Sequence, residues 1–151
     1  MAALKEQLHA DLVTALKARD ELTTATLRML LTAVTNEEVS GTSARELTDD
    51  EVQRVINREA KKRREAAEAF AGAGRTEQAQ RERDEEDVLT RYLPAQLDDA
   101  ALTALIADAI AESGANDPRQ LGQVMKLVTP KVAGRADGKR VSAEVRRQLT
   151  S

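Results

Sequence analysis

The spacing of leucine residues is the feature that most constrains how this chain can fold. Leu4, Leu8, Leu12 and Leu16 recur every four residues, which places them along one side of an α-helix. Apolar residues recur at helical spacing along the rest of the chain, and residues with high helix propensity outnumber aromatic and β-branched ones. The sequence therefore predicts an all-α protein.

Helix-start and helix-stop signals divide the chain into seven helical segments. The clearest start is Thr48-Asp-Asp-Glu51, a capping box in which the Thr48 hydroxyl and the Glu51 carboxylate satisfy each other's free backbone N–H groups. Leu47 and Val52 fit the apolar staple that accompanies such a start. A fourth segment is expected at about residues 76–91.

Three further segments are expected after residue 94. Asp98 can cap the first of them, and Asp117 the second, with a proline at its first helical position. Pro130 falls late in that second segment, which predicts a kink or break near Thr129. Ser142 is expected to cap the short last helix.

Pro94 is expected to separate two domains, because the residue before a proline is pushed out of helical geometry. The predicted organisation is an N-terminal helical bundle of about four helices over residues 1–94, followed by a small three-helix C-terminal domain over residues 95–151.

Composition excludes several kinds of functional site. With no Cys and one His, the chain offers no disulfide, no thiol chemistry and no multi-histidine metal site. The motifs that bind nucleotide phosphates or expose a nucleophilic serine are also missing. No catalytic residue, metal ligand or cofactor is therefore expected. No apolar run could span a bilayer and residues 1–6 do not read as a signal peptide, so a cytoplasmic location without membrane contact is expected.

Charge is distributed unevenly along the chain. The formal net charge is -4 over residues 1–94, -5 over residues 95–118 and +6 over residues 119–151. A basic C-terminal segment suggests an anionic partner such as a phosphate backbone, but a solvated helix surface explains the same charges and both interpretations stay open. The candidate phosphate contacts are Lys126, Lys131, Arg135, Lys139, Arg140, Arg146 and Arg147.

A second basic run, residues 61–64, lies inside the third segment. Four consecutive residues point around the whole helix, so they do not form one patch. Pairs such as Arg64 with Glu68 can stabilise the helix. This run therefore favours a structural role.

Glycines and basic residues are interspersed between Gly134 and Ser142. Exposed turn amides followed by a helix N-terminus can bind an anion, although a plain helix end and a turn explain the pattern too. Gly134 and Gly138 are expected to set turns, and Gly122 is expected to allow close helix packing. Because aromatic residues are nearly absent, any RNA contact would go to phosphates and to the shape of structured RNA rather than to stacked bases.

Five sequence segments carry a recognisable pattern in one order: residues 27–34, 69–75, 92–94, 121–126 and 134–138. Together they resemble the GatB/YqeY family of small cytosolic proteins, and the resemblance covers essentially the whole chain. The C-terminal part also resembles the tail domain of GatB, a component of the amidotransferase that converts misacylated Glu-tRNA(Gln) and Asp-tRNA(Asn).

The resemblance implies an accessory role rather than independent catalysis. In GatB the tail contacts tRNA, which implies tRNA as a partner here, along with amidotransferase or aminoacyl-tRNA synthetase components. The family label is carbon–nitrogen ligase activity with glutamine as amido donor, but nothing here resembles the catalytic cradle of GatB. No stand-alone activity is therefore expected. The alternative is a helical protein–protein interaction adaptor that does not bind nucleic acid.

Overall fold

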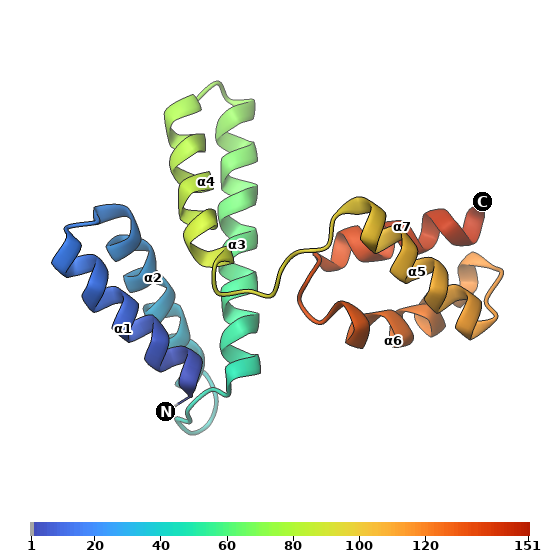
Figure 1. The fold of residues 1–151 in the computed structure, drawn as a ribbon, viewed down its shortest axis with the longest axis horizontal. Helices are drawn as coiled ribbons and strands as arrows, with labels where there is room; N and C mark the ends of the chain where they lie inside the picture. Colours follow the sequence, from blue (N-terminus) through green and yellow to red (C-terminus); the bar gives the residue numbers. More distant parts are fainter. Residues whose placement is uncertain (1) are drawn as a thin grey trace. The chain divides into compact units, whose positions relative to one another are not determined.

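The computed structural model describes residues 2–151, and every regular element in this range is helical (Figure 1). The all-α class is confirmed, as is the succession of four helices and then three. None of the helices within the described range is long and apolar enough to cross a membrane. The elements are α1 (Ala3–Ala18), α2 (Glu21–Glu38), α3 (Asp49–Gly72), α4 (Thr76–Thr90), α5 (Asp99–Ser113), the short 3-10 helix η1 (Pro118–Gln120), α6 (Leu121–Val132) and α7 (Gly138–Thr150).

Contacts along the chain group these helices into two compact units. The first, here called the N-terminal unit, contains α1–α4 and ends at Leu93. The second, the C-terminal unit, runs from Pro94 to Ser151 and contains α5–α7. Each unit has its own cluster of buried apolar side chains.

Two hydrogen bonds cap the start of α3 in the N-terminal unit. The Thr48 hydroxyl accepts a hydrogen bond from the Glu51 amide at 3.3 Å, and the Glu51 carboxylate accepts one from the Thr48 amide at 3.2 Å. This confirms the predicted capping box. Leu47 and Val52 on either side of the cap are both buried in the core.

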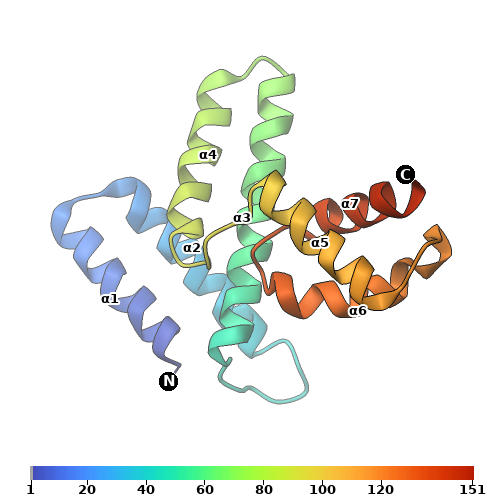
Figure 2. The same ribbon diagram turned by 45° about the vertical axis from the view of Figure 1, so that its right-hand side comes forward.

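Beyond this core, α3 and α4 lie side by side as an antiparallel hairpin (Figure 2). The buried positions along the hairpin include Ala67 and Ala79, and such small side chains allow two helix backbones to approach closely. Gly74, with φ of +77°, makes the tight connection between the two helices.

The leucine stripe of α1 is only partly covered. Leu8 is fully buried, whereas Leu16 is 44% exposed and the neighbouring Val13 is 48% exposed. On the same helix, the Asp11 carboxylate accepts a hydrogen bond from the Tyr92 hydroxyl at 2.6 Å. Burial and this bond raise the pKa of Tyr92.

The C-terminal unit has a core of valine, leucine, isoleucine and alanine side chains and contains no aromatic residue. The Asp98 carboxylate accepts a hydrogen bond from the Ala101 amide at 2.7 Å, which confirms the predicted cap. Gly114 ends α5 with φ of +71°. Asp117 caps η1, which leads directly into α6.

Of the predicted kink or break near Thr129, the break is wrong, because α6 continues through Pro130 to Val132. Pro130 lies two residues from the end of α6. It removes one backbone hydrogen bond there, and less than one further turn of helix follows it. The Thr129 hydroxyl donates to the carbonyl of Met125 at 2.8 Å in the same turn.

The expected start of the last helix at Ser142 is also wrong. The helix α7 begins at Gly138 and is capped by Asp137, whose carboxylate accepts a hydrogen bond from the Lys139 amide. Ser142 lies inside the helix and donates to the Lys139 carbonyl at 3.2 Å. An Asp-Gly pair is typical of turns and of helix starts alike, which explains the error.

Candidate nucleic-acid interface

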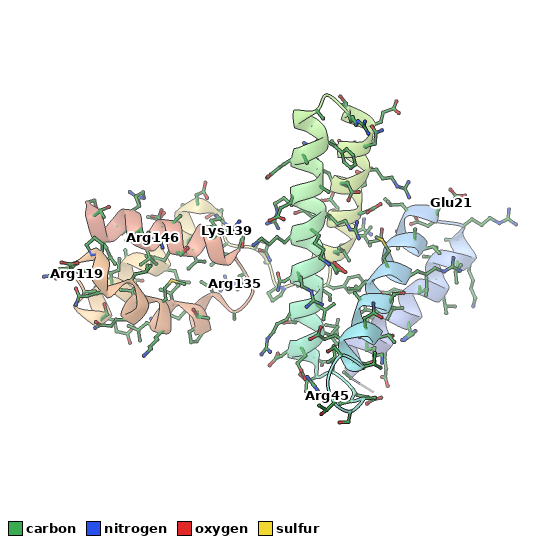
Figure 3. The ribbon with its side chains drawn as sticks, turned by 180° about the vertical axis from the view of Figure 1, so that it is seen from behind. Glu21, Arg45, Arg119, Arg135, Lys139 and Arg146 are labelled. Atoms are coloured by element: carbon green, nitrogen blue, oxygen red, sulfur yellow. The ribbon has the colours of Figure 1, made fainter. Side chains whose placement is uncertain are left out.

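All seven candidate phosphate contacts belong to the C-terminal unit, on α6, on α7 and in the turn between them. Figure 3 shows three of them, Arg135, Lys139 and Arg146, with Lys139 and Arg146 on the same helix. Those on α6 are Lys126 and Lys131, that in the turn is Arg135, and those on α7 are Lys139, Arg140, Arg146 and Arg147.

Folding packs the basic segment, residues 119–151, against the acidic segment that precedes it, residues 95–118. Residues 95–118 form α5 and the loop after it, and they carry five acidic and no basic side chains. Residues 119–151 carry eight basic and two acidic ones. Since both segments pack into one unit, that unit has a net charge of only +1. The net charge of +6 on residues 119–151 is therefore largely balanced by the acidic residues of the same unit.

Two of the candidates form ion pairs with acidic residues of α5. The Lys131 ammonium lies 2.7 Å from the Glu112 carboxylate, and the Arg140 guanidinium lies 2.8 Å from the Asp99 carboxylate. Each pair is exposed to solvent, so each contributes little to the stability of the fold. In both pairs, however, the cation that could bind a phosphate is already bound to a carboxylate.

Arg147 is held more firmly, within its own helix. It donates to both carboxylate oxygens of Glu144, and Glu144 also accepts hydrogen bonds from the Thr103 hydroxyl at 3.2 Å and the Gln148 amide at 3.0 Å. The hydrogen bonds from Arg147, followed by those from Gln148, lower the pKa of Glu144 to about 2. Glu144 therefore stays ionised and keeps Arg147 engaged near neutral pH.

Arg135 helps to fix the chain that leads into α5. Its carbonyl accepts a hydrogen bond from the Leu97 amide at 2.8 Å, and its Nε donates to the Ala95 carbonyl at 3.4 Å. Nearby, the Gln96 side chain donates to the Gly134 carbonyl at 3.2 Å. Arg135 therefore helps to hold residues 95–97 in place.

Three candidates remain, Lys126, Lys139 and Arg146. All three are exposed, and their side chains make no hydrogen bond or ion pair with any other residue of the range 2–151. Lys139 and Arg146 are seven residues apart, so they lie on one side of α7 with Cα atoms about 10 Å apart along the helix axis. These three side chains are the ones positioned to contact an anion without breaking an internal bond.

The turn between α6 and α7 does not present a vacant set of amides. The carboxylate of Asp137 caps the helix and lies 3.4 Å from the Lys139 amide. Of the two interpretations of this stretch, the structure therefore favours a helix end followed by a capped helix start over an open anion nest.

The roles predicted for the three glycines agree with the structure at one position and differ at two. Gly134 has φ of +80° and sets the turn, as predicted. Gly138 is the first residue of α7 rather than a turn residue, so that prediction is wrong. Gly122 is not a close-packing position either, because a Cβ built there meets nothing within 4 Å.

The basic run in α3 is structural, in agreement with its sequence pattern. Arg63 lies 3.6 Å from carboxylate oxygens of both Glu82 and Glu85, and Arg64 lies 3.0 Å from Glu86. All of these carboxylates belong to α4, so the pairs tie the hairpin together. Burial, together with the nearby Glu82, raises the pKa of Glu85.

We also looked for a metal site among the carboxylates and the single histidine. Within residues 2–151 no group of three or more His, Asp or Glu side chains is arranged to hold a metal ion. His9 lies on the exposed side of α1.

Sequence reasoning missed Asp99 as the partner of Arg140. The two residues are 41 positions apart, so no local spacing rule connects them. The available signal was the five acidic residues in the segment directly before the basic one, which a three-helix unit has to fold together.

Comparison with known proteins gives one result for nearly the whole chain. A family model described as "Yqey-like protein" matches residues 5–149. No curated protein matches the chain.

Proposed function

The chain belongs to the YqeY-like family, and from this premise we propose that it is an accessory protein that binds tRNA, or a tRNA-dependent amidotransferase complex, through its C-terminal unit. Aminoacyl-tRNA synthetase components are further candidate partners of such a complex. The proposal assigns no stand-alone ligase activity to the chain.

The observation that carries this proposal is the set of three exposed cations without internal partners, Lys126, Lys139 and Arg146. They belong to the part of the chain whose sequence resembles the tRNA-contacting tail of GatB. The other four candidates are engaged in bonds within the unit. The proposed contact surface is therefore smaller than the basic segment itself.

The same unit favours a particular kind of RNA contact. Residues 94–151 contain no Phe, Tyr, Trp or His, so no ring is present on which an unpaired base could stack. Lysine and arginine bind phosphates whatever the base sequence. We expect contacts to the backbone of structured RNA, with little preference for sequence.

Titration of tRNA at two salt concentrations tests the proposal. The variant K126E/K139E/R146E should bind about tenfold more weakly than the wild type or worse, and its dependence on salt should be shallower by about one unit for each lost phosphate contact. The matched control is K17E/R28E/R54E, which makes the same change in net charge on exposed residues of the N-terminal unit.

Two results would contradict the proposal. One is the lack of tRNA binding by the wild type at low salt. The other is an equal loss of affinity in both triple variants, which would indicate a general effect of net charge rather than a surface on the C-terminal unit.

A second candidate function is protein docking by the N-terminal unit. Val13 and Leu16 are three residues apart on α1, so they share a face, and both are about half exposed. V13E/L16E should abolish a protein contact at this face and leave tRNA binding unchanged. A stable protein partner that survives nuclease treatment and depends on these two residues would favour this function.

A further inference from the structure

Arg140 is held from two sides by different kinds of bond. Its Nη1 donates to the Leu97 carbonyl at 2.8 Å, and Leu97 is buried in the core of the C-terminal unit. Its Nη2 donates to the Asp99 carboxylate, also at 2.8 Å, but the side chain of Asp99 is 97% exposed. The inner edge of the guanidinium is therefore fixed by the fold, and the outer edge is covered by one solvated carboxylate.

Arg147 offers a contrast on the same helix. Its partner Glu144 has only 17% of its side chain exposed and is bound by two further side chains. An incoming anion that took the place of the Glu144 carboxylate would have to disrupt that network, although the Arg147 side chain is itself 61% exposed. At Arg140 it would have to displace Asp99 alone.

The surface beside Arg140 has room for such an anion. A groove of about 450 Å³ lies between α5 and α7, and its lining includes Asp99 and Thr103 on one side and Arg140, Glu144 and Arg147 on the other. The Glu144 carboxylate is already bound by Arg147, so Asp99 is the lining carboxylate that a phosphate would replace. A guanidinium binds carboxylate and phosphate with the same planar fork of donors. A phosphate group can therefore take the place of the Asp99 carboxylate while the bond to Leu97 keeps Arg140 in position.

We infer that Asp99 is an internal competitor for a backbone phosphate of the bound RNA, so that the C-terminal unit limits its own affinity at Arg140. This inference rests on the proposed function and adds to the three free cations a fourth contact, which forms only when Asp99 is displaced. Removal of one negative charge from Asp99 should then strengthen RNA binding through Arg140.

The test compares two single substitutions in α5 with the same change in net charge. D99N removes the negative charge that competes for the outer edge of Arg140, and D108N removes an exposed carboxylate nine residues away, on the opposite side of the helix. In tRNA titrations at low salt, D99N should raise affinity about two- to fivefold, the range set by a single exposed ion pair. D108N should raise it by clearly less.

A double variant shows whether the gain acts through Arg140. D99N/R140Q should lose the gain of D99N, whereas D108N/R140Q should differ from R140Q as D108N differs from the wild type. Asp98, not Asp99, caps α5, so D99N should fold normally, which thermal unfolding followed by circular dichroism verifies.

The outcomes separate this inference from the proposed function. If the wild type does not bind tRNA at low salt, both are overturned. If the wild type binds and D99N has the same affinity as D108N, or keeps its gain in the D99N/R140Q background, the competition by Asp99 is overturned and the proposed function stands.

Discussion

Two arginines, Arg63 in the N-terminal unit and Arg140 in the C-terminal unit, face carboxylates with very different exposure to solvent. In the N-terminal unit, Arg63 has 22% of its side chain exposed and lies between two carboxylates of α4 that are 10% and 17% exposed. In the C-terminal unit, the Asp99 side chain that faces Arg140 is 97% exposed, and Lys139 and Arg146 face water. The comparison teaches that burial, not the number of basic residues, separates charges that maintain a fold from charges available to a partner.

The largest expected effect tests whether the two cores are independent. Ile56→Ala and Ile106→Ala each remove a fully buried side chain, one from each core, and each should lower the free energy of unfolding of its own unit by about 2–4 kcal/mol. Hydrogen exchange resolved along the chain measures this, with loss of protection confined to the mutated unit. Loss of protection in both units from either change would show one cooperative domain.

A smaller effect should distinguish the two kinds of arginine. Arg63→Met removes the cation that lies between Glu82 and Glu85 and leaves Glu85 with Arg81 as its remaining partner. It should lower the free energy of unfolding of the N-terminal unit by about 1–3 kcal/mol, less than for a fully buried pair because Arg63 is partly exposed. Arg147→Met removes a surface pair and should cost much less. Urea unfolding of the two variants checks this, with Arg63→Lys as the control that keeps the charge. Equal costs would remove the distinction between the units.

The two units should also differ in their response to pH. The pKa of Glu85 is raised in the folded state, so the ionised form opposes folding and its unfavourable contribution fades as pH falls through that raised value. Glu85→Gln should therefore leave the N-terminal unit at least as stable as the wild type at pH 7, with the difference shrinking in acid.

Glu144 is the opposite case. Its pKa is lowered to about 2 from an ordinary 4.5, so its favourable contribution is complete above pH 4.5 and is lost as pH falls toward 2. Glu144→Gln should destabilise the C-terminal unit at pH 7, and the difference from the wild type should shrink as pH falls toward 2. Unfolding curves of both variants from pH 7 to pH 2 measure the two differences, and slopes of the same sign would contradict this assignment.

The smallest expected effect concerns packing at the surface of the C-terminal unit. A Cβ at Gly122 meets nothing within 4 Å and the residue lies inside α6, so Gly122→Ala should stabilise this unit by about 0.5 kcal/mol. Gly134→Ala is the control, because φ of +80° is strained for alanine and the change should destabilise. A loss of stability in Gly122→Ala would indicate close packing at that position.

Features that depend on neighbours in sequence could be predicted, and features that depend on distant pairs could not. The capping box at Thr48 and the cap at Asp98 involve residues three positions apart, and both were correct. The start of α7 was misplaced because Asp137-Gly138 and Ser142 give competing local signals. The partners of Arg140 and Lys131 come from 41 and 19 residues away, so the sequence could list candidate contacts but could not tell the free ones from the engaged ones.

The hydrogen bond from Tyr92 to Asp11 has a practical consequence. The chain contains one tyrosine and no tryptophan, so its intrinsic fluorescence comes from a single phenol that is tied to α1. That emission reports on the N-terminal unit alone, because the C-terminal unit contains no aromatic ring. A tryptophan placed in α7 would add a second, spectrally separate signal, and the two units could then be followed independently in one sample.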